Sequence, residues 1–356
     1  MVKQSPASSF HIPSSKPPLV VLVGETASGK SALALELAEK FGGEIICADS
    51  WTVYRDFNIG TAKPSASDCK RVPHHLLDIA DPALGFSAPQ FQKLALAAIE
   101  DIASRGKLAI MVGGTGLYID SVIFDYGFLP APNAGERARL NRLTLAELVK
   151  ITNKLSCLSL ATIDASNKRR VIRLIENNGQ LPTKSSLRQN TLLLGLNLPR
   201  EQLAARITNR VDAMLANGLE QEVKQLAEIY SWQTEPMKGI GYREWRDYFN
   251  GQTSLEQTRQ KIIKSSLGLA KKQRTWFKRP VYQDLVASDL PFLAKSSSGS
   301  IDAQSSAPQS PAHNLTQKSS SQKLPAHGKS AARNKSIQWL NNNSKAVEII
   351  TAFLNK

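Results

Sequence analysis

The sequence has few cysteines and no long hydrophobic run. Its three cysteines, Cys47, Cys69 and Cys157, are widely spaced among 356 residues and form no C-x-x-C pair. This spacing excludes a disulfide framework or a small zinc module and is typical of a protein of the reducing cytoplasm. No apolar run reaches the roughly 18 to 20 residues that a spanning helix needs, so we expect no membrane-spanning helix and no partner within the membrane. Residues 1–18 lack the apolar region of a signal peptide, and we interpret them as a flexible lead.

Acidic residues are also scarce relative to basic ones. The chain has 30 Asp and Glu against 45 Lys and Arg, a formal net charge of +15. The segment after residue 290 holds eight of the basic and two of the acidic residues, which leaves +9 on the rest of the chain. An anionic partner is therefore expected, either a nucleic acid or a membrane surface, and charge alone does not choose between them.

Residues 19–130 alternate short apolar runs with amphipathic segments. This pattern predicts an α/β fold with a parallel sheet flanked by helices. Strands are expected at residues 19–23, 44–50 and 107–114. Ser87 can cap a helix that ends near Gly106. The apolar residues expected to share one face of that helix are Phe91, Leu94, Ala98 and Ile102.

Beyond residue 130 the strand signals nearly vanish. One short apolar run, TLLLGLNL (191–198), interrupts a series of amphipathic segments. We expect a mainly helical insertion over residues 131–190 and a helical C-terminal part over 191–289 that completes the core. Residues 290–335 are rich in Ser, Ala, Gln, Pro and Lys and are expected to be disordered, whereas 336–356 has the pattern of a terminal helix. The remaining helices are expected at 136–150, 166–177, 200–217, 219–230 and 254–278.

A phosphate-binding loop follows the first strand. The segment GETASGKS matches G-x-x-x-x-G-K-[ST], with Gly24, Gly29, Lys30 and Ser31 at the fixed positions. Backbone N–H groups of such a loop converge on anionic oxygens at a helix N-terminus, Lys30 adds a full charge, and Ser31 can bind Mg²⁺. The loop specifies a diphosphate or a longer chain of phosphates, and it does not by itself specify ATP.

Two polar residues are expected beside this loop. Asp49 follows the second strand and Thr115 follows the third, and the carboxyl ends of parallel strands are where α/β folds bind ligands. Asp49 could instead be a helix cap or a Mg²⁺ ligand, and Thr115 could cap a tight turn. His74 and His75 are adjacent in a strand and point to opposite faces, so they are not expected to chelate a metal.

Eight segments together resemble those of the tRNA dimethylallyltransferases, the tRNA isopentenyltransferases that modify the adenosine next to the anticodon. The resemblance covers residues from about 19 to 279 and implies a P-loop NTPase-like fold. The segments are GETASGKS, ADSWTVYR followed by NIGTAKP, VPHHLLDI, VGGTGLY, RRVIR, RITNRVDAMLANGLEQEV, GIGYRE and AKKQRTWFKR.

The resemblance implies a reaction, a metal ion and a partner. The loop would hold dimethylallyl diphosphate with Mg²⁺, and the dimethylallyl group would pass to the exocyclic N6 amine of the adenosine on the 3′ side of the anticodon. Diphosphate would be released. The target base would have to leave its stack to reach the reaction channel. A cytoplasmic monomer that binds a tRNA anticodon arm is expected.

The resemblance also implies roles for single residues. Asp49 would be the general base, Lys30 would stabilise the leaving diphosphate, Thr115 would line the reaction channel, and Ser31 would bind the metal. The diphosphate would be held by Gly24, Glu25, Thr26, Ala27, Ser28, Gly29, Lys30, Ser31 and Arg210. Contacts with tRNA would be made by Asp49, Ser50, Trp51, Thr52, Thr115, Arg137, Arg169, Arg170, Val171, Ile172, Arg173, Lys238, Gly241 and Tyr242.

The chain departs from the family pattern at three places. Glu25 stands where the family usually has Pro, and an acid beside a diphosphate is compatible with binding if its side chain turns to solvent or shares the metal. Thr52 stands where Gln is frequent. Near residues 237–241 a common Arg-Cys-Val/Ala-Gly pattern appears as Lys-Gly-Ile-Gly, which keeps a positive charge at Lys238.

Two basic segments fit a folded RNA. One is Arg169–Arg173, and the other interleaves basic residues with Trp276 and Phe277. Three alternatives remain open. These are a small-molecule kinase with ATP in the loop and RRVIR as its lid, an adenylate isopentenyltransferase, and a non-catalytic RNA-binding protein. The basic residues of the second segment are Lys271, Lys272, Arg274, Lys278 and Arg279.

Overall fold

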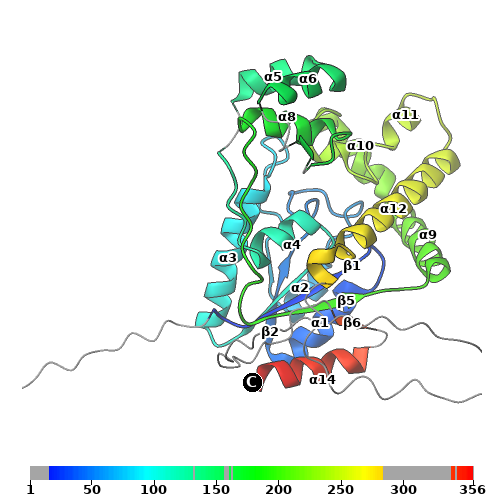
Figure 1. The fold of residues 1–356 in the computed structure, drawn as a ribbon. Helices are drawn as coiled ribbons and strands as arrows, with labels where there is room; N and C mark the ends of the chain where they lie inside the picture. The colour runs from blue at the N-terminus through cyan, green and yellow to red at the C-terminus, as the bar shows by residue number, and fades with distance from the viewer. Residues whose placement is uncertain are drawn as a thin grey trace, which may run out of the picture.

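A central parallel sheet with helices on both faces forms the body of the chain (Figure 1). The computed structural model describes residues 16–130, 133–155, 160–161, 163–283, 338–340 and 343–355. Most of the expected lead and all of the expected linker therefore lie outside the described residues. None of the helices in the described part combines the length and the apolar character that crossing a lipid bilayer requires.

The sheet has six strands in the order β3-β2-β4-β1-β5-β6, all paired in parallel. Strand β1 is central and fully buried, and its Leu22 pairs with Val112 on one side and Leu194 on the other. The predicted P-loop NTPase-like sheet is confirmed. The strands are β1 Leu19–Gly24, β2 Gly43–Cys47, β3 His74–His75, β4 Leu108–Gly113, β5 Thr191–Leu196 and β6 Gln338–Leu340.

Strand β5 corrects the expectation of a helical chain after residue 130. TLLLGLNL supplies it, and it pairs directly with β1. A short, continuously apolar run is compatible with either a buried strand or a buried helix, so its pattern alone does not decide. Pairing with β1 decides it, because the apolar side chains of a central parallel strand are buried on both faces.

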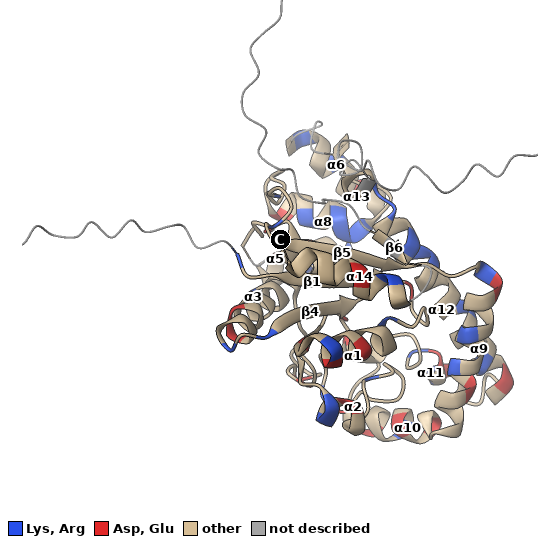
Figure 2. Ribbon diagram, turned by 90° about the horizontal axis from the view of Figure 1, so that it is seen from below, with Lys and Arg blue, Asp and Glu red and all other residues tan. Residues whose placement is uncertain are grey.

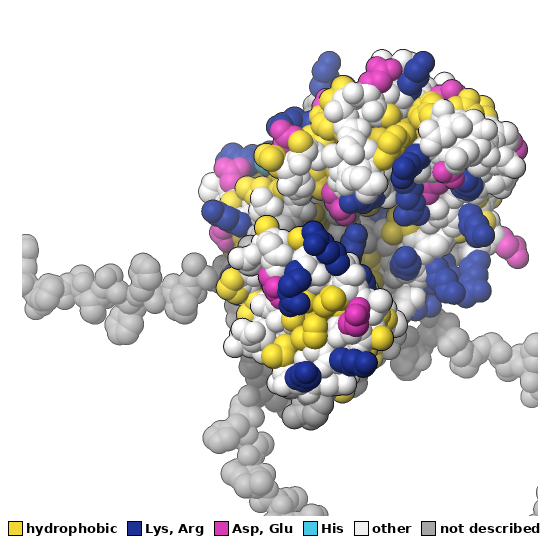
Figure 3. All heavy atoms as spheres, turned by 90° about the horizontal axis from the view of Figure 1, so that it is seen from above, with side chains coloured by type: hydrophobic (Ala, Val, Ile, Leu, Met, Phe, Trp, Pro, Cys, Tyr) yellow, Lys and Arg dark blue, Asp and Glu magenta, His cyan; other side chains and the backbone are white. Residues whose placement is uncertain are grey.

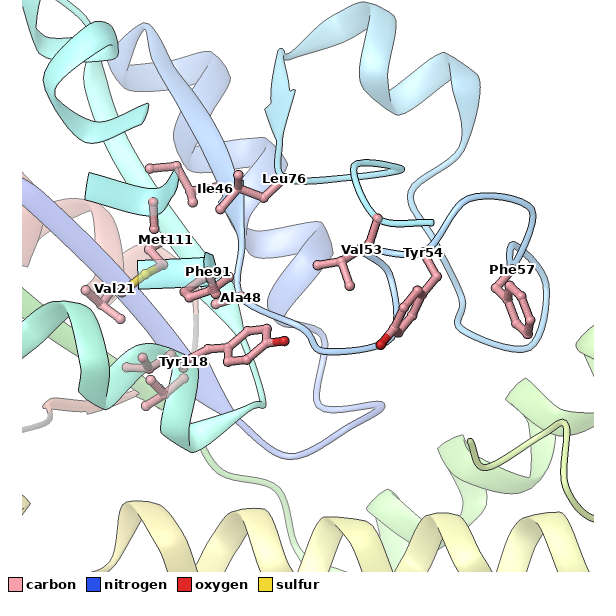
Figure 4. Packing of buried hydrophobic residues seen from close by; sticks show 14 of the residues in the cluster. Val21, Ile46, Ala48, Val53, Tyr54, Phe57, Leu76, Phe91, Met111 and Tyr118 are labelled. Carbon is pink, nitrogen blue, oxygen red and sulfur yellow. The ribbon is translucent and has the colours of Figure 1, made fainter. Parts of the chain in front are cut away.

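Helices α1 (Lys30–Phe41) and α3 (Ala88–Ser104) cover opposite faces of the sheet. The expected face of α3 is partly wrong, because Leu94 is 39% exposed. Phe91 is buried on this helix and stacks on Tyr118 with ring centroids 4.1 Å apart (Figure 4). Helix α4 (Gly116–Ile123) carries Tyr118. The buried face of α3 follows a spacing of four and then three residues, through Phe91, Ala95, Ile99 and Ile102.

A small helical lobe stands above the sheet and is formed by α5 (Ala134–Arg142), α6 (Leu145–Leu155) and α8 (Lys168–Glu176). The single helix expected over 136–150 is two helices, since Leu143 leaves the helical conformation. The lobe has a core of its own, separate from the cores on the two sheet faces. Its buried residues are Leu140, Leu148, Val171, Ile172 and Ile175.

Four further helices close the site end of the sheet, and α12 is the longest of them. It runs across the C-terminal end of β1 and packs along α9 (Figure 1). Ser254 caps α12 and accepts a hydrogen bond from the backbone N–H of Gln257 at 3.2 Å. The four helices are α9 Arg200–Ala216, α10 Leu219–Ile229, α11 Trp245–Phe249 and α12 Leu255–Phe277.

The terminal segment docks on the body. Strand β6 pairs in parallel with β5, and helix α14 (Asn343–Leu354) lies beside α1 (Figures 1 and 2). Leu340, Ala346 and Ile350 are buried in the same cluster as the apolar residues of α1. Three further short helical elements are α2 at Ala66–Arg71, shortly before β3, a 3-10 helix at Pro236–Lys238, and α13 at Pro280–Gln283.

Candidate active site

The phosphate loop joins β1 to α1 and has the backbone of an anion cradle. Gly24 and Gly29 have φ angles of 146° and 98°, values that side chains disfavour. A Cβ atom at Gly24 would lie 2.6 Å from the carbonyl oxygen of Leu196, so β5 also excludes a side chain there. Ala27 has a φ of 61°. The loop is therefore shaped by the two strands beside it as well as by its own glycines.

The Lys30 ammonium is turned into the loop. Its Nζ donates to the carbonyl oxygen of Glu25 at 2.5 Å. Burial and the nearby Arg210 lower the pKa of Lys30 to about 8, and the carboxylates of Asp49 and Glu25 act against this shift. A dianionic or trianionic ligand in the loop would offset the burial and favour the charged ammonium.

Two arginines of α9 reach the loop from the same face of the helix. Arg210 donates through Nη1 to Thr26 Oγ1 at 3.0 Å and through Nη2 to the carbonyl oxygen of Thr61 at 3.5 Å. Arg206 donates to the carbonyl oxygen of Ser28 at 3.3 Å. Arg206 is not part of the predicted site, although its position four residues before Arg210 on a helix predicts a shared face.

Asp49 and Thr115 lie at the C-terminal edge of the sheet. Asp49 is two residues past the end of β2, and its Oδ1 accepts from the backbone N–H of Trp51 at 2.9 Å. Thr115 Oγ1 accepts from the backbone N–H of Ser50 at 3.0 Å. The hydroxyl of Thr115 makes no cap for α4. These bonds tie the turn after β2 to the turn after β4.

A pocket joins the loop, Asp49 and α9. It encloses about 630 Å³ of empty space, counting the open volume at its mouth. Its polar side includes Thr26, Asp49 and Arg210, and Trp51 lines it as well. Much of the remaining lining is apolar. Such a division suits a ligand with an anionic head and a short hydrocarbon tail. The apolar lining residues are Ile207, Val211, Met214, Ile240, Ile262 and Leu269.

The side chain of Glu25 does not turn to solvent, which was one of the two arrangements expected to make an acid compatible with diphosphate binding. Its side chain is 4% exposed, and both carboxylate oxygens are bonded to the guanidinium of Arg274 on α12. The neighbouring Gln273 accepts the backbone N–H of Thr26 at 2.7 Å and donates to the carbonyl oxygen of Gly114 at 3.2 Å. Helix α12 therefore holds the loop and the turn before Thr115 together.

The described residues contain no group of three or more His, Cys, Asp or Glu side chains placed to hold a metal ion. His75 is paired with Glu44 at 2.7 Å, and the ring of His74 is hydrogen-bonded to the carbonyl oxygen of Val72. A magnesium ion bound mainly by phosphate oxygens needs only one or two protein ligands. Ser31 is exposed, and its hydroxyl fits that requirement.

The sequence of residues 52–280 matches the family described as IPP transferase. The chain belongs to the IPP transferase family. A relative named tRNA dimethylallyltransferase, from Anoxybacillus flavithermus, is 43% identical over 270 residues, which are 73% of this chain and 87% of the relative.

Solved structures of the IPP transferase type share the fold. The full-length tRNA isopentenylpyrophosphate transferase of Bacillus halodurans has a TM-score of 0.57 at 37% identity, over 74% of this chain and 88% of that one. A eukaryotic dimethylallyltransferase that acts on tRNA has a TM-score of 0.64 at 28% identity, over 76% of this chain and 72% of that one.

In this IPP transferase, the residues expected to contact tRNA differ in exposure. Arg169 and Arg170 are exposed on α8, whereas the side chains of Val171 and Ile172 are buried in the core of the lobe. A tRNA contact at Val171 or Ile172 would have to involve backbone atoms. Lys238 is exposed, and its Nζ lies 3.7 Å from Glu235.

Arg137 and Arg173 share the buried carboxylate of Glu176. Arg173 also donates to the carbonyl oxygens of Leu129 and Pro130, at 2.9 and 2.6 Å. Both arginines therefore stabilise the lobe. To contact a tRNA phosphate, either guanidinium would have to bind the phosphate while keeping these bonds.

Gly241 and Tyr242 are buried, and Thr52 is 7% exposed with no hydrogen-bond partner for its hydroxyl among the described residues. Gly241 lines the pocket. Tyr242 donates to Glu222 at 2.8 Å, and Trp51 packs against Gly239. Trp51 and Gly241 therefore border the pocket directly, whereas Thr52 and Tyr242 are not among its lining residues.

The basic and aromatic segment of α12 divides into two groups. Lys271, Lys272 and Lys278 are exposed. Arg274 is bound to Glu25, and Arg279 is bound to the buried Asp120 at 2.5 Å and lies over the Trp276 ring. Among the basic residues of this segment, only the lysines have no carboxylate partner in the described part of the chain, so the group that can face RNA is smaller than expected from the sequence.

Proposed function

We propose that this chain transfers a dimethylallyl group from dimethylallyl diphosphate to the exocyclic N6 amine of the adenosine on the 3′ side of a tRNA anticodon. The observation that carries this function is the shared pocket. Thr26 of the phosphate loop, Asp49 and several apolar side chains all line one cavity. Names of the relatives support the same activity.

The donor would bind with its diphosphate at the loop. Lys30, Arg206 and Arg210 bring three positive charges to the loop. The five-carbon tail would lie against the apolar wall formed by α9 and α12. Ser31 would hold Mg²⁺ together with the phosphate oxygens, and the ion would supply electrostatic stabilisation to a departing diphosphate.

The acceptor amine would approach from the Asp49 side. As the N–C bond forms and the C–O bond to diphosphate breaks, the amine becomes acidic and its proton passes to an Asp49 oxygen. Asp49 Oδ1 is held by the Trp51 N–H, which orients the carboxylate. The charge that grows on the diphosphate is met by Lys30 and the two arginines, and preorganised charges of this kind are the main source of rate acceleration.

The tRNA would lie over the helical lobe and α12. Figure 3 looks onto the face that carries the lobe and shows Lys and Arg side chains on both sides of a recess. The exposed cations Arg169, Arg170, Lys271, Lys272 and Lys278 are available for phosphate contacts. A free mononucleotide acceptor would not need so wide a basic surface, which disfavours the adenylate alternative.

The Asp49→Asn variant tests the reaction directly. Asparagine keeps an oxygen for the Trp51 N–H but cannot accept the proton, so we expect single-turnover prenyl transfer to fall about a hundredfold or more. Binding of tRNA in a gel-shift titration should stay within about threefold of the wild type. Wild-type transfer by the variant would remove Asp49 from the role of general base.

A further inference from the structure

The acid in the phosphate loop is neutralised by one side chain that lies 249 positions away in the sequence. Glu25 is 3% exposed, and Arg274 Nη2 donates to its Oε2 at 2.8 Å. The same Nη2 donates to the carbonyl oxygen of Leu198 at 3.2 Å, which anchors the guanidinium at the end of β5. Hydrogen bonding to Glu25 raises the pKa of Arg274 further above its ordinary value.

We propose that Arg274 is a positioning residue for the diphosphate donor. It cancels the charge of Glu25 and thereby lets a loop that contains an acid accept an anionic ligand. The inference rests on the proposed function for the identity of the donor. It concerns the charge balance of the loop, which inorganic diphosphate can probe without any transfer reaction.

The charge balance depends on this pair because Glu25 is part of the cradle itself. Its carbonyl oxygen already accepts a hydrogen bond from the Lys30 ammonium. Its carboxylate acts to raise the pKa of Lys30. Without Arg274, a buried carboxylate would face the diphosphate and offset the charge of Lys30. A single unpaired charge at such a range changes binding by roughly tenfold or more at the effective dielectric constant of protein sites.

The geometry of the loop does not depend on Arg274 alone. The uncharged side chain of Gln273 accepts a hydrogen bond from the backbone N–H of Thr26, with 2.7 Å between nitrogen and Oε1. A variant at residue 274 that keeps Gln273 therefore removes the charge compensation while one anchor of the loop remains. This separates the electrostatic role from a purely structural one.

The experiment measures the Kd of inorganic diphosphate in the presence of Mg²⁺ by calorimetry. The variants are Arg274→Met, Glu25→Gln and the double variant Glu25→Gln/Arg274→Met. Arg259→Met is the matched control. Arg259 also lies on α12 and binds a carboxylate with two nitrogens, at 2.6 and 3.0 Å, but that carboxylate belongs to the exposed Asp212. Thermal unfolding without ligand accompanies each titration.

We expect Arg274→Met to raise the Kd about tenfold or more. The double variant should return to within about threefold of the wild type, and Arg259→Met should not differ from it. A double variant as weak as Arg274→Met would contradict the inference, and so would a wild-type Kd in Arg274→Met. If Arg274→Met does not fold, a Kd for the double variant more than about tenfold above that of the wild type would equally overturn it.

A failure of the proposed function would look different. In that case the wild type would transfer no dimethylallyl group to tRNA, whereas the diphosphate titrations would still report on the pair. KM for dimethylallyl diphosphate should follow the same order as the Kd values, and KM for tRNA should not change in any of these variants.

Discussion

At the residue scale, a few side chains set the charge around the phosphate loop. Their contacts with one another could not be predicted from the sequence. Lys30 is turned onto the Glu25 carbonyl oxygen, and burial brings its pKa down to about 8. Arg206 and Arg210 lie beside it. A lysine poised in this way can gain a proton when an anion binds.

The first prediction concerns the pH dependence of donor binding. The anion favours the charged ammonium, so the pKa of Lys30 should rise in the complex. Affinity for inorganic diphosphate should then be highest below about pH 8 and should fall as pH rises through the pKa of the free protein, by up to about tenfold per pH unit. Calorimetry between about pH 7 and 9.5 measures this.

The Lys30→Arg variant is the control for that prediction, because arginine stays charged over the whole range. It should bind diphosphate with no comparable fall above pH 8. An equal fall in Lys30→Arg and wild type would show that another group titrates.

Much of this site was predictable residue by residue, and the exceptions have a common cause. The loop, Asp49 and Thr115 are marked by local motifs at strand ends, and the structure brings them to one edge. The pairing of Glu25 with Arg274 has no local signature, because it joins groups distant in the sequence. Neither does the use of Arg173 within the lobe.

At the scale of elements, one carboxylate of α10 holds the turn that forms part of the pocket. Glu222 Oε2 accepts the backbone N–H groups of Asn58 and Ile59 at 3.1 and 2.7 Å. Its Oε1 accepts the N–H of Gly60 and the Tyr242 hydroxyl, at 3.1 and 2.8 Å. Four donors converge on one side chain and fix Gly60, which lines the pocket.

Replacing Glu222 by Gln should destabilise the protein by about 1–3 kcal/mol, because an amide group would face N–H donors that lose their acceptor. Chemical denaturation measures the free energy of unfolding. Glu220→Gln is the matched control, since Glu220 lies on the same helix and accepts the Tyr248 hydroxyl at 3.0 Å. Equal losses in the two variants would contradict the special role of Glu222.

The elements were predicted with mixed success. Helices α8, α9, α10 and α12 begin and end within two residues of their expected limits, because each has regular helical spacing and a clear end. Strand β5 was missed, since its apolar run has no alternation. The docking site of α14 could not be predicted either, because an amphipathic pattern shows that a helix has an apolar face but not which surface that face packs against.

Docking of the terminal helix gives a further prediction. Ile350 is fully buried between α14 and the sheet, so Ile350→Ala should lower the free energy of unfolding by about 2–5 kcal/mol. Thr351→Ala, at an exposed position of the same helix, should lower it by less than about 0.5 kcal/mol. Equal stability of the two variants would mean that α14 does not contribute to the core.

At the scale of the whole molecule, the sheet, the helices that cover its site end and the helical lobe have different roles in the proposed reaction. The sheet and the phosphate loop supply a rigid floor, α9 and α12 supply cations and the apolar wall, and the lobe of α5, α6 and α8 presents further cations (Figures 1 and 3). Helix α12 belongs to two of these parts, because it holds the loop through Gln273 and Arg274 and exposes lysines on its outer side. The proposed chemistry requires an anionic isoprenoid donor, not ATP, in the loop.

The most direct test is a mass analysis of nucleosides from unmodified tRNA after incubation with the protein and Mg²⁺, with either dimethylallyl diphosphate or ATP. With dimethylallyl diphosphate, the account predicts an adenosine whose mass has risen by one dimethylallyl group in place of a hydrogen, located beside the anticodon. With ATP alone it predicts unchanged nucleosides. Unmodified tRNA in both reactions, together with consumption of ATP, would contradict it.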